Sequence, residues 1–408
     1  MKSASNWLVA AVTLIIPTAA FAQAEWPQWR GPKRDGLSPD TGLLKQWPAG
    51  GPSLAWKATG MGVGYSSVSV MADRVYTLGD TTDACTLIAL NAADGKLLWR
   101  SRVGPPVGHN KYPGPRSSPA TDGNLIIALG QQGDFVCFNV TDGKERWRKH
   151  LEKDFGGRMM SGWRWSESPL LDGDKVLCTP GGPKGSVIAL KKATGEILWQ
   201  STDLTDKATY SSLVPVEIGG THQYLVLTEV SVAGIASENG ELLWRVDRKI
   251  EKATAIVATP IYNDGHVFVT SSYRFGTCNG YKIAAEGGRF KADQVYSGTQ
   301  LKNHHGGVVV VGDHVYGTND QSLICLDLKT GKEVWTERSV GKGSIAYADG
   351  HLVVRSERGP VALVEATPTG YKEKGRFNQP DRSRENSWAH PVVIGGKLFL
   401  RDQDVLLC

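Results

Sequence analysis

A glycine stands four residues before a tryptophan at five places in this chain, each time inside a turn-forming pair such as Asp-Gly or Thr-Gly. The copies read "NAADGKLLW", "NVTDGKERW", "KKATGEILW", "SENGELLW" and "DLKTGKEVW". Their tryptophans occupy positions 99, 147, 199, 244 and 335, so successive copies are 45 to 52 residues apart and the last gap spans two periods. A period of this length indicates a repeat architecture in which one small unit recurs along the chain.

Each copy predicts a β-hairpin. The β-rich run before the turn, such as "LIALN", and the run that ends in tryptophan are its two strands, and glycine supplies the positive φ that a tight turn needs. Two more alternating runs precede each hairpin, as in "SSVSVMADRVYTLG". Each unit is therefore expected to be a four-stranded antiparallel sheet, and such units repeated radially form a β-propeller.

The outermost strands predict eight blades. The run "SLAWKA" and two degenerate copies that end near Tyr296 and Phe377 add three to the five full copies. "SLAWKA" lacks three preceding strands and the C-terminal "HPVVIGGKLFLRDQDVLLC" lacks a fourth, so we expect the N-terminal strand to join the C-terminal blade and close the ring. The fold class is thus an all-β, eight-bladed propeller of four-stranded antiparallel blades over residues 53–408. Its tryptophans are expected to pack between blades: Trp56, Trp99, Trp147, Trp199, Trp244 and Trp335.

The pattern from Ala89 to Trp99 resembles the tryptophan-docking motif of the PQQ-like β-propeller repeats, named after pyrroloquinoline quinone (PQQ). The Trp-Asp signature of WD40 repeats, which have a similar period, is absent. The resemblance covers the chain from about residue 53 to its end and implies one of two functions. The family includes quinoprotein dehydrogenases and the non-catalytic outer-membrane assembly lipoprotein, so fold alone does not decide between them.

The first 22 residues have the pattern of a secretory signal peptide. Lys2 precedes the apolar run "WLVAAVTLIIPTAA", and Ala20 and Ala22 form a small-x-small cleavage site before Gln23. The apolar run is shorter than the ~20 residues of a spanning helix, and no cysteine follows it to accept a lipid. We therefore expect a secreted or periplasmic protein without stable membrane insertion, with residues 23–52 as an N-terminal extension.

Composition narrows the partners. The net charge of +5 is too small and too dispersed for a nucleic-acid binder.

Cys137, Cys325 and Cys408 fall in the strand position that Ala89 and Ala189 fill in other copies, which is typical of buried free thiols. Equivalent strands of different blades are too far apart to bridge, so we expect six free thiols and no disulfide. We expect a monomer.

The starts of the innermost strands crowd around one mouth of a propeller and are the candidate ligand-binding residues. They are Tyr65, Ser66, Arg116, Ser117, Trp165, Glu167, Tyr210, Thr259, Lys302, Asn303, His304, His305, Lys342, Trp388 and His390. Serine pairs and aromatic rings also satisfy strand starts and fill channels without binding anything. As a set, however, exposed polar and aromatic loop residues favour a binding surface.

The charges of this set favour an anionic ligand. Arg116, Lys302 and Lys342, with three histidines, face the single carboxylate of Glu167. His304 and His305 are neighbours, and neighbours on a strand point to opposite faces, so no metal site is predicted.

The favoured function is a non-catalytic binding or scaffold protein whose cationic channel mouth receives an anionic small molecule or a segment of an envelope protein. The alternative is a PQQ-dependent dehydrogenase that oxidises an alcohol or a sugar. The resemblance implies that such enzymes stack PQQ on a disulfide of adjacent cysteines, bind calcium through several oxygens and use an aspartate base. This chain has no adjacent cysteines and one carboxylate in the set, although a cationic mouth also suits a tricarboxylate cofactor.

Overall fold

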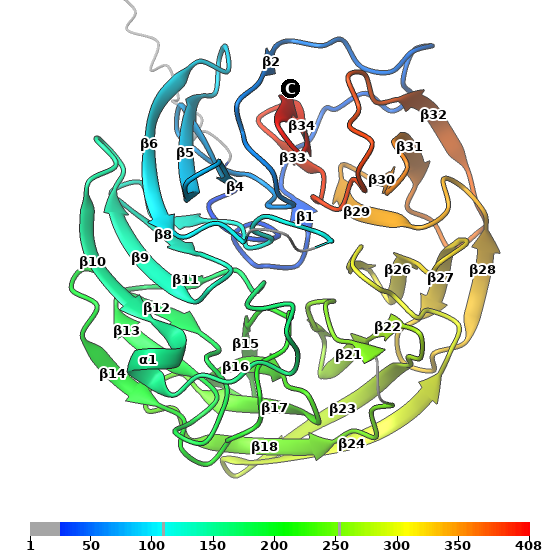
Figure 1. The fold of residues 1–408 in the computed structure, drawn as a ribbon. Helices are drawn as coiled ribbons and strands as arrows, with labels where there is room; N and C mark the ends of the chain where they lie inside the picture. The colour runs from blue at the N-terminus through cyan, green and yellow to red at the C-terminus, as the bar shows by residue number, and fades with distance from the viewer. Residues whose placement is uncertain (1–24, 108–110, 252–253) are drawn as a thin grey trace, which may run out of the picture.

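Eight sheets are arranged radially about one axis in the computed structural model, which describes residues 25–107, 111–251 and 254–408 (Figure 1). The four blade strands of each sheet are antiparallel, and the one additional strand, residues 37–38, pairs in parallel. The predicted signal peptide lies outside the described residues. Seven sheets have four strands and one has five. The eight-bladed propeller predicted from the repeat is therefore confirmed.

The first four blades follow one another along the chain. Blade 1 comprises β3 (Ser69–Met71), β4 (Arg74–Asp80), β5 (Cys85–Asn91) and β6 (Leu97–Gly104), and blade 2 comprises β7 (Ala120–Thr121), β8 (Leu125–Leu129), β9 (Asp134–Asn139) and β10 (Glu145–His150). Blade 3 comprises β11 (Leu170–Asp172), β12 (Lys175–Cys178), β13 (Ile188–Lys191) and β14 (Ile197–Gln200), and blade 4 comprises β15 (Val214–Ile218), β16 (Thr221–Leu227), β17 (Ser231–Ala236) and β18 (Leu242–Asp247).

The last four blades carry the additions to the regular unit. Blade 5 comprises β20 (Ile261–Asn263), β21 (His266–Thr270), β23 (Cys278–Glu286) and β24 (Arg289–Gly298), and blade 6 comprises β25 (Val308–Val311), β26 (His314–Thr318), β27 (Leu323–Asp327) and β28 (Glu333–Glu337). Blade 7 comprises β29 (Gly343–Ala348), β30 (His351–Ser356), β31 (Pro360–Glu365) and β32 (Glu373–Asn378), with β1 (Leu37–Ser38) as its fifth strand. Blade 8 comprises β33 (Val392–Ile394), β34 (Lys397–Asp402), β35 (Val405–Leu407) and β2 (Lys57–Ala58), and β19 (Thr254–Ala255) pairs with β22 (Ser272–Tyr273) outside the blades.

One short helix, α1 (Leu151–Phe155), follows β10. Within the described ranges, no helix has the length and apolar character that crossing a membrane requires.

The two ends of the propeller meet in blade 8. Strand β2 pairs with β35 through Lys57 opposite Leu407 and Ala58 opposite Leu406. Figure 1 shows this closure, with the blue β2 beside the red C-terminal strands. The predicted closure of the ring by the N-terminal strand is confirmed, and the closed ring protects the edges at which an open sheet would aggregate.

The docking aromatic residues cover the turn glycine of the next blade. A Cβ atom added to Gly95 would lie 2.6 Å from the Trp56 ring, and one added to Gly195 would lie 2.8 Å from the Trp147 ring. The same contact joins Trp99 to Gly143, Trp199 to Gly240, Tyr296 to Gly331 and Phe377 to Gly51. These glycines therefore provide both a left-handed turn and a flat seat for a ring.

Two of the tryptophans depart from this contact. Trp244 donates to the side-chain oxygen of Gln223 in its own blade, at 2.7 Å, because the next blade has the long β23–β24 hairpin in place of the tight turn. Trp335 donates to the backbone oxygen of Thr367 at 2.9 Å without a glycine beneath it. Trp244 and Trp335 are therefore held by hydrogen bonds, and neither ring packs on a turn glycine of the next blade.

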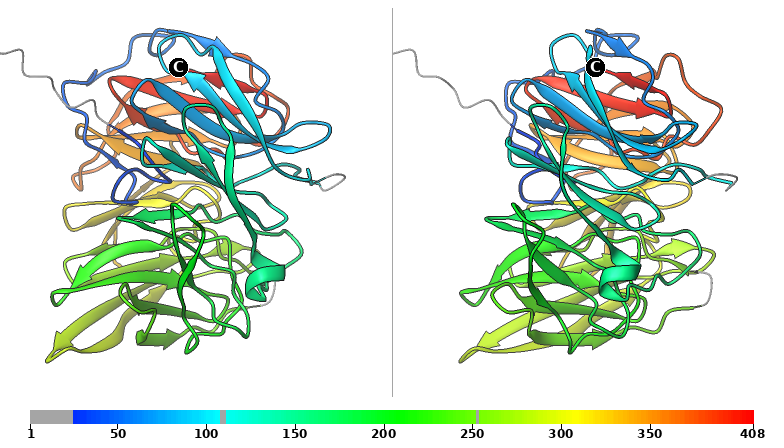
Figure 2. Two further views of the ribbon diagram at one scale, coloured as in Figure 1. Left: turned by 90° about the vertical axis from the view of Figure 1, so that its left-hand side faces the viewer. Right: turned by 60° about the vertical axis from the view of Figure 1, so that its left-hand side comes forward.

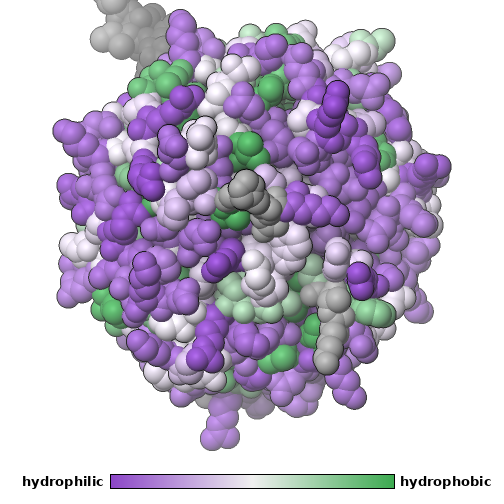
Figure 3. Space-filling view, in the orientation of Figure 1, coloured by the Kyte–Doolittle hydropathy of each residue, from purple (hydrophilic) through white to green (hydrophobic). Residues whose placement is uncertain are grey.

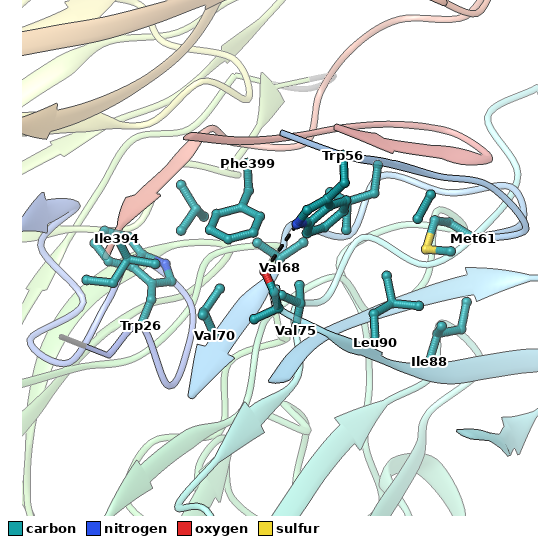
Figure 4. Close-up of a cluster of buried hydrophobic side chains, with 14 residues drawn as sticks. Trp26, Trp56, Met61, Val68, Val70, Val75, Ile88, Leu90, Ile394 and Phe399 are labelled. Carbon is teal, nitrogen blue, oxygen red and sulfur yellow. Dashed lines mark hydrogen bonds between the residues drawn. The ribbon is translucent and has the colours of Figure 1, made fainter. Parts of the chain in front are cut away.

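A hydrophobic cluster at the ring closure joins blades 1 and 8 (Figure 4). Trp56 and Phe399 lie with ring centroids 6.0 Å apart, and the Trp56 indole donates to the Ala92 oxygen at 3.1 Å. Val75 from β4 is fully buried beneath them, and Trp26 reaches the same cluster from the N-terminal extension.

Small residues lie opposite the docking rings on the neighbouring strand. Ala89 pairs with Trp99, Cys137 with Trp147 and Cys325 with Trp335. The six cysteines are free in the structure, as the sequence predicts, and burial raises the pKa of the Cys137 thiol to about 12. These thiols pack as small apolar groups.

Residues 26–40 cross the centre of the ring and contact seven of its eight blades. The contacts run in chain order: Trp26 bridges to Val70, Pro27 accepts from Thr121, Gln28 accepts from Leu171, Trp29 donates to Thr259, Arg30 donates to Val308, β1 pairs with β29, and Asp40 accepts from Gly396. We call residues 26–40 the central segment. Figure 2 shows its dark-blue start on the face opposite to α1.

Arg34 is the buried anchor of the central segment. Its guanidinium donates to the backbone oxygens of Pro169 at 2.7 Å and Ser168 at 2.9 Å, at the start of blade 3. Burial lowers the pKa of Arg34 to about 9, and the nearby Glu167 opposes that shift. Removing a buried charge from such a set leaves its partners unsatisfied, which is strongly destabilising.

Replacement of a seat glycine should cost more than replacement of an open one. Gly195 has φ 72° and Gly396 has φ 71°, but only Gly195 lies under a ring; nothing lies within 4 Å of a Cβ at Gly396. We expect Gly195→Ala to lower the free energy of unfolding by about 2 to 4 kcal/mol and Gly396→Ala by about 1 kcal/mol. Urea unfolding of both variants measures this difference. Equal losses of unfolding free energy would show that the contact between Trp147 and Gly195 does not stabilise the propeller.

Arg34→Met should destabilise the propeller by about 3 to 5 kcal/mol, because the buried Glu167 loses its nearby positive charge and two buried carbonyls lose their donor. Lys33→Met is the matched control, since Lys33 is the adjacent residue and its side chain is exposed. Its effect should stay within about 0.5 kcal/mol. Similar unfolding midpoints for the two variants would show that the central segment does not anchor the ring.

Candidate functional site

A pocket opens at the centre of the face that carries α1, and the central segment forms its floor. Trp29 lies at this floor, where its indole donates to Thr259 at 3.0 Å and its ring packs 4.5 Å from the His390 ring. Figure 3 views this face, where the side chains around the centre are paler, and so less hydrophilic, than the purple rim. Trp29 therefore limits the depth of the pocket from this face.

Seven of the eight blades or their connections contribute to the wall. The lining residues are Trp29, Tyr65, Tyr112, Arg116, Trp163, Ser166, Ser168, Tyr210, Ser212, Ala255, Val257, Tyr273, His304, His305, Trp388 and His390. The empty space between them is about 1010 Å³ when the open solvent at the mouth is included, but the part that the centre of a water molecule can occupy is about 170 Å³. This is below the roughly 300 to 1,000 Å³ of clefts that enclose a whole drug-sized ligand, so the space suits a small ligand or one residue of a longer chain.

Trp388 is the centre of the aromatic wall. Its ring centroid lies 4.7 Å from that of Tyr65, 4.8 Å from Tyr112 and 5.2 Å from His305. These rings come from segments that precede blades 1, 2, 6 and 8, so the radial arrangement of blades brings them together. Their packing fixes the rings and makes a rigid wall.

Arg116 is the cation of the pocket wall. Its Nη2 donates to the Tyr112 oxygen at 2.8 Å, its Nη1 donates to the Trp163 oxygen at 3.2 Å, and its guanidinium lies 5.9 Å from the Tyr65 ring centroid. Burial lowers its pKa from the usual value. In the part of the chain that the structure describes, Arg116 forms no ion pair, although Asp80 lies near enough to oppose the lowering of its pKa. The two carbonyls hold the guanidinium in place without a direct carboxylate partner.

The histidines add no charge near neutral pH. Burial lowers the pKa of His304 and His390 to about 3 and also lowers the pKa of His305. His304 and His305 lie in a bend before β25, and both line the pocket with ring centroids 5.2 Å apart. The expectation that they point to opposite faces is therefore wrong, because they precede the strand.

Glu357 supports the wall from behind. Its Oε2 accepts from the Trp388 indole and the His305 Nε2, each at 3.1 Å. These two donors, with the charge of Lys342, hold the pKa of Glu357 at about 2. The carboxylate is therefore ionised and engaged by its neighbours.

The structure brings about half of the predicted residues to the pocket. Tyr65, Arg116, Tyr210, His304, His305, Trp388 and His390 line it. Thr259 lies beside the floor as the acceptor for Trp29, and Lys342 is paired with Asp320 at 2.8 Å. Lys302 is half-buried outside the lining. Of the three basic residues predicted at the mouth, Arg116 is therefore the one that lines the described pocket.

The remaining predicted residues are buried below the wall. Glu167 is buried and accepts from the Cys178 thiol, and burial raises its pKa. Trp165 belongs to the hydrophobic cluster of blades 2 and 3. The side chains of Ser66, Ser117 and Asn303 are also buried, and Asn303 bonds the Thr318 oxygen at 2.8 Å.

The sequence reasoning missed Trp29, Tyr112, Trp163, Tyr273 and the serines Ser166, Ser168 and Ser212. Trp29 lies in the extension, and Tyr112 and Trp163 lie in the connections between blades. Ser168 and Ser212 stand at strand starts of the same kind as Ser117, so that signal was present in "SESP" and "YSSL".

The wall does not fit calcium-bound PQQ as the family resemblance describes it. Among the described residues, no group of three or more histidine, cysteine or acidic side chains is placed to hold a metal ion, and no carboxylate lines the pocket. One guanidinium also leaves two charges of a tricarboxylate unbalanced. The cysteines are dispersed through the blades and none lines the pocket.

Acid should weaken the fold through the buried histidines. An imidazole that titrates near 6.5 when unfolded and near 3 when folded makes the unfolded chain bind more protons between those values. The free energy of unfolding should fall below pH 6.5 by about 1.4 kcal/mol per pH unit for each such histidine. Between pH 6 and 4, His304→Gln should reduce the slope of the free energy of unfolding against pH by about 1.4 kcal/mol per pH unit. Urea unfolding at three pH values measures this slope. An unchanged slope would mean that His304 is charged in the folded protein.

The family model described as "Outer membrane protein assembly factor BamB" matches residues 83–337, more than half of the chain. Curated relatives with that name include one from Kangiella koreensis, 24% identical over 196 residues, which are 46% of this chain and 44% of the relative. Another, from Shewanella oneidensis, is 24% identical over 270 residues, 60% of this chain and 61% of the relative. The matched parts of this chain thus span about half the length of these relatives.

Two solved structures share the fold. The crystal structure of BamB from Moraxella catarrhalis superposes with a TM-score of 0.61 at 14% identity, over 87% of this chain and 96% of that one. The computationally designed Ika8 protein superposes with a TM-score of 0.60 at 12% identity, over 87% and 99%. The repeat, the ring and the family match agree: this chain belongs to the family of the outer membrane protein assembly factor BamB, within the PQQ-like β-propellers.

Proposed function

We propose that this protein is a non-catalytic binding propeller of the cell envelope, and that its aromatic pocket receives an anionic ligand or an acidic segment of an envelope partner. The observation that carries the proposal is Arg116, a half-buried guanidinium with no ion pair in the described chain, held by two backbone carbonyls in the wall of an open pocket. A partly desolvated charge without a paired anion costs free energy, and an anion that enters the pocket reduces that cost.

The polar groups of the wall support binding without turnover. His305 Nε2 is bonded to Glu357, and His390 Nε2 is bonded to the backbone oxygen of His305. These two nitrogens therefore hold the wall together, and burial lowers the pKa of His304 and His390 to about 3, which makes both imidazoles weak proton acceptors near neutral pH. The lining offers rings, hydroxyls and one cation, which is a set suited to recognition.

The envelope location rests on the relatives and on the N-terminus. The matched relatives are named outer membrane protein assembly factors, and we extend to this chain a place in the same compartment. The signal-peptide pattern of residues 1–22 supports secretion or a periplasmic location. A role of this protein in outer membrane protein assembly, as the names of the relatives suggest, is likewise a proposal, since the matches span about half of each relative.

A photo-crosslinking residue at Tyr273 should capture the partner in intact envelopes, because Tyr273 lines the pocket and is 56% exposed. The same residue at Phe275 is the matched control, since Phe275 is 52% exposed but does not line the pocket. Arg116→Glu should reduce the Tyr273 adduct at least tenfold and leave any Phe275 adduct unchanged. Arg289→Glu, a charge reversal on the exposed β24, should change neither.

Two results would overturn the proposal. A Tyr273 adduct that Arg116→Glu leaves unchanged, with a folded variant by its melting temperature, would show that the pocket charge selects nothing. Oxidation of an alcohol or a sugar by the unmodified protein, after incubation with PQQ and calcium in a dye-linked assay, would establish the dehydrogenase alternative.

A further inference from the structure

The pocket carries one positive charge for a large area of ring surface. Among the described lining residues, Arg116 is the cation, and seven of the other side chains are tryptophans or tyrosines. Ligands with several negative charges, such as phosphate esters, are held by several cations or by bidentate arginines. Each Nη atom of Arg116 already donates one of its two N–H groups to a carbonyl, so the geometry favours a ligand with a single carboxylate and with faces that can stack on the rings.

The neutral polar groups of the wall narrow the framework. Ser166, Ser168 and Ser212 line the pocket together with Tyr65, Tyr112, Tyr210 and Tyr273, but the hydroxyl oxygens of Ser166 and Tyr65 are buried and Tyr210 is bonded to Ser161. Ser168 Oγ and Ser212 Oγ each accept one backbone N–H and keep an O–H to donate, and Tyr112 and Tyr273 add two further hydroxyls to the wall. Hydroxyls both donate and accept hydrogen bonds. A hydrocarbon side chain would leave polar groups of this kind facing apolar surface, which disfavours binding. A ligand with hydroxyls around a ring satisfies them and still presents apolar C–H faces to the aromatic rings.

The backbone at Tyr273 supports a ligand contact at the rim. Tyr273 has φ 112°, a conformation that side-chain-bearing residues rarely adopt, and its ring lies 5.6 Å from the His304 ring. Strain of this kind clusters at ligand clamps. The strained conformation keeps an exposed tyrosine at the pocket, where it adds a ring face to the wall.

We infer that the pocket binds a carboxylated sugar residue, a uronic acid of an acidic saccharide, with its carboxylate on Arg116 and its ring against Trp388, Tyr65 and Tyr273. This inference rests on the proposed function, since it names the ligand of the same pocket. The open mouth lets one residue of a longer chain enter while the rest stays in solvent, and the floor at Trp29 limits its depth.

Calorimetric titration tests the ligand class with three probes: a short oligogalacturonate, the same oligomer fully methyl-esterified, and an oligoglutamate peptide. The acidic saccharide should bind at least about tenfold more tightly than its ester, because a hydrogen bond to a charged group adds at least that factor. It should also bind more tightly than the peptide. Arg116→Gln should lower the affinity for the acid to that of the ester, and Arg289→Gln on β24 should change nothing.

A second variant separates ring contact from charge. Tyr273→Ala should weaken the binding of the acid and of the ester by the same factor, because it removes a ring face and leaves Arg116 in place. Tyr273 is exposed, so its removal leaves the buried packing of the blades intact. Tighter binding of the peptide than of the saccharide would overturn the inference and leave the proposed function standing. Absence of saccharide binding together with an Arg116-dependent Tyr273 adduct would do the same. An adduct independent of Arg116 would remove the proposed function itself.

Discussion

The contact between an outer-strand ring and the turn glycine of the next blade is the interaction on which the rest of the structure depends. It needs a glycine for two reasons at once: the turn has a positive φ, and a Cβ at Gly95 or Gly195 would meet the indole above it. It also needs a small residue opposite the ring, as Ala89 is opposite Trp99. Repetition of this contact around the ring sets the spacing of the blades, and so the position of the inner strand starts that line the pocket.

The central segment turns that ring into a pocket with one mouth. A ring of eight blades leaves its inner strands around a common axis, and residues 26–40 bond to seven of those blades as they cross it. Arg34 and Trp29 do different work within it. Arg34 satisfies the carbonyls at the start of blade 3, whereas Trp29 places a ring under the pocket. The fold and the site are therefore coupled through a segment that belongs to no repeat.

This difference explains what the sequence could predict. The blade number, the ring closure and the free cysteines follow from a pattern that recurs in register, so each copy supports the others. The central segment occurs once, and nothing in its residues announces which blades it contacts. The strand starts located Tyr65, Arg116 and His390 correctly near one mouth, but their charge depends on burial and pairing. Lys342 forms an ion pair with Asp320, and burial lowers the pKa of His390, so that its imidazole is neutral near pH 7.

The selectivity of the pocket follows from how Arg116 is held. Two connections, one before blade 2 and one before blade 3, contribute the carbonyls of Tyr112 and Trp163 that orient the guanidinium. Folding has therefore already positioned the charge and removed part of its water, so a ligand anion meets a donor that needs little further ordering. A neutral ligand of the same shape gains the aromatic contacts but leaves the guanidinium without a counter-charge. The pocket discriminates between the two ligands by the difference in their binding free energies. This difference grows as the wall around the guanidinium becomes more rigid and less accessible to water.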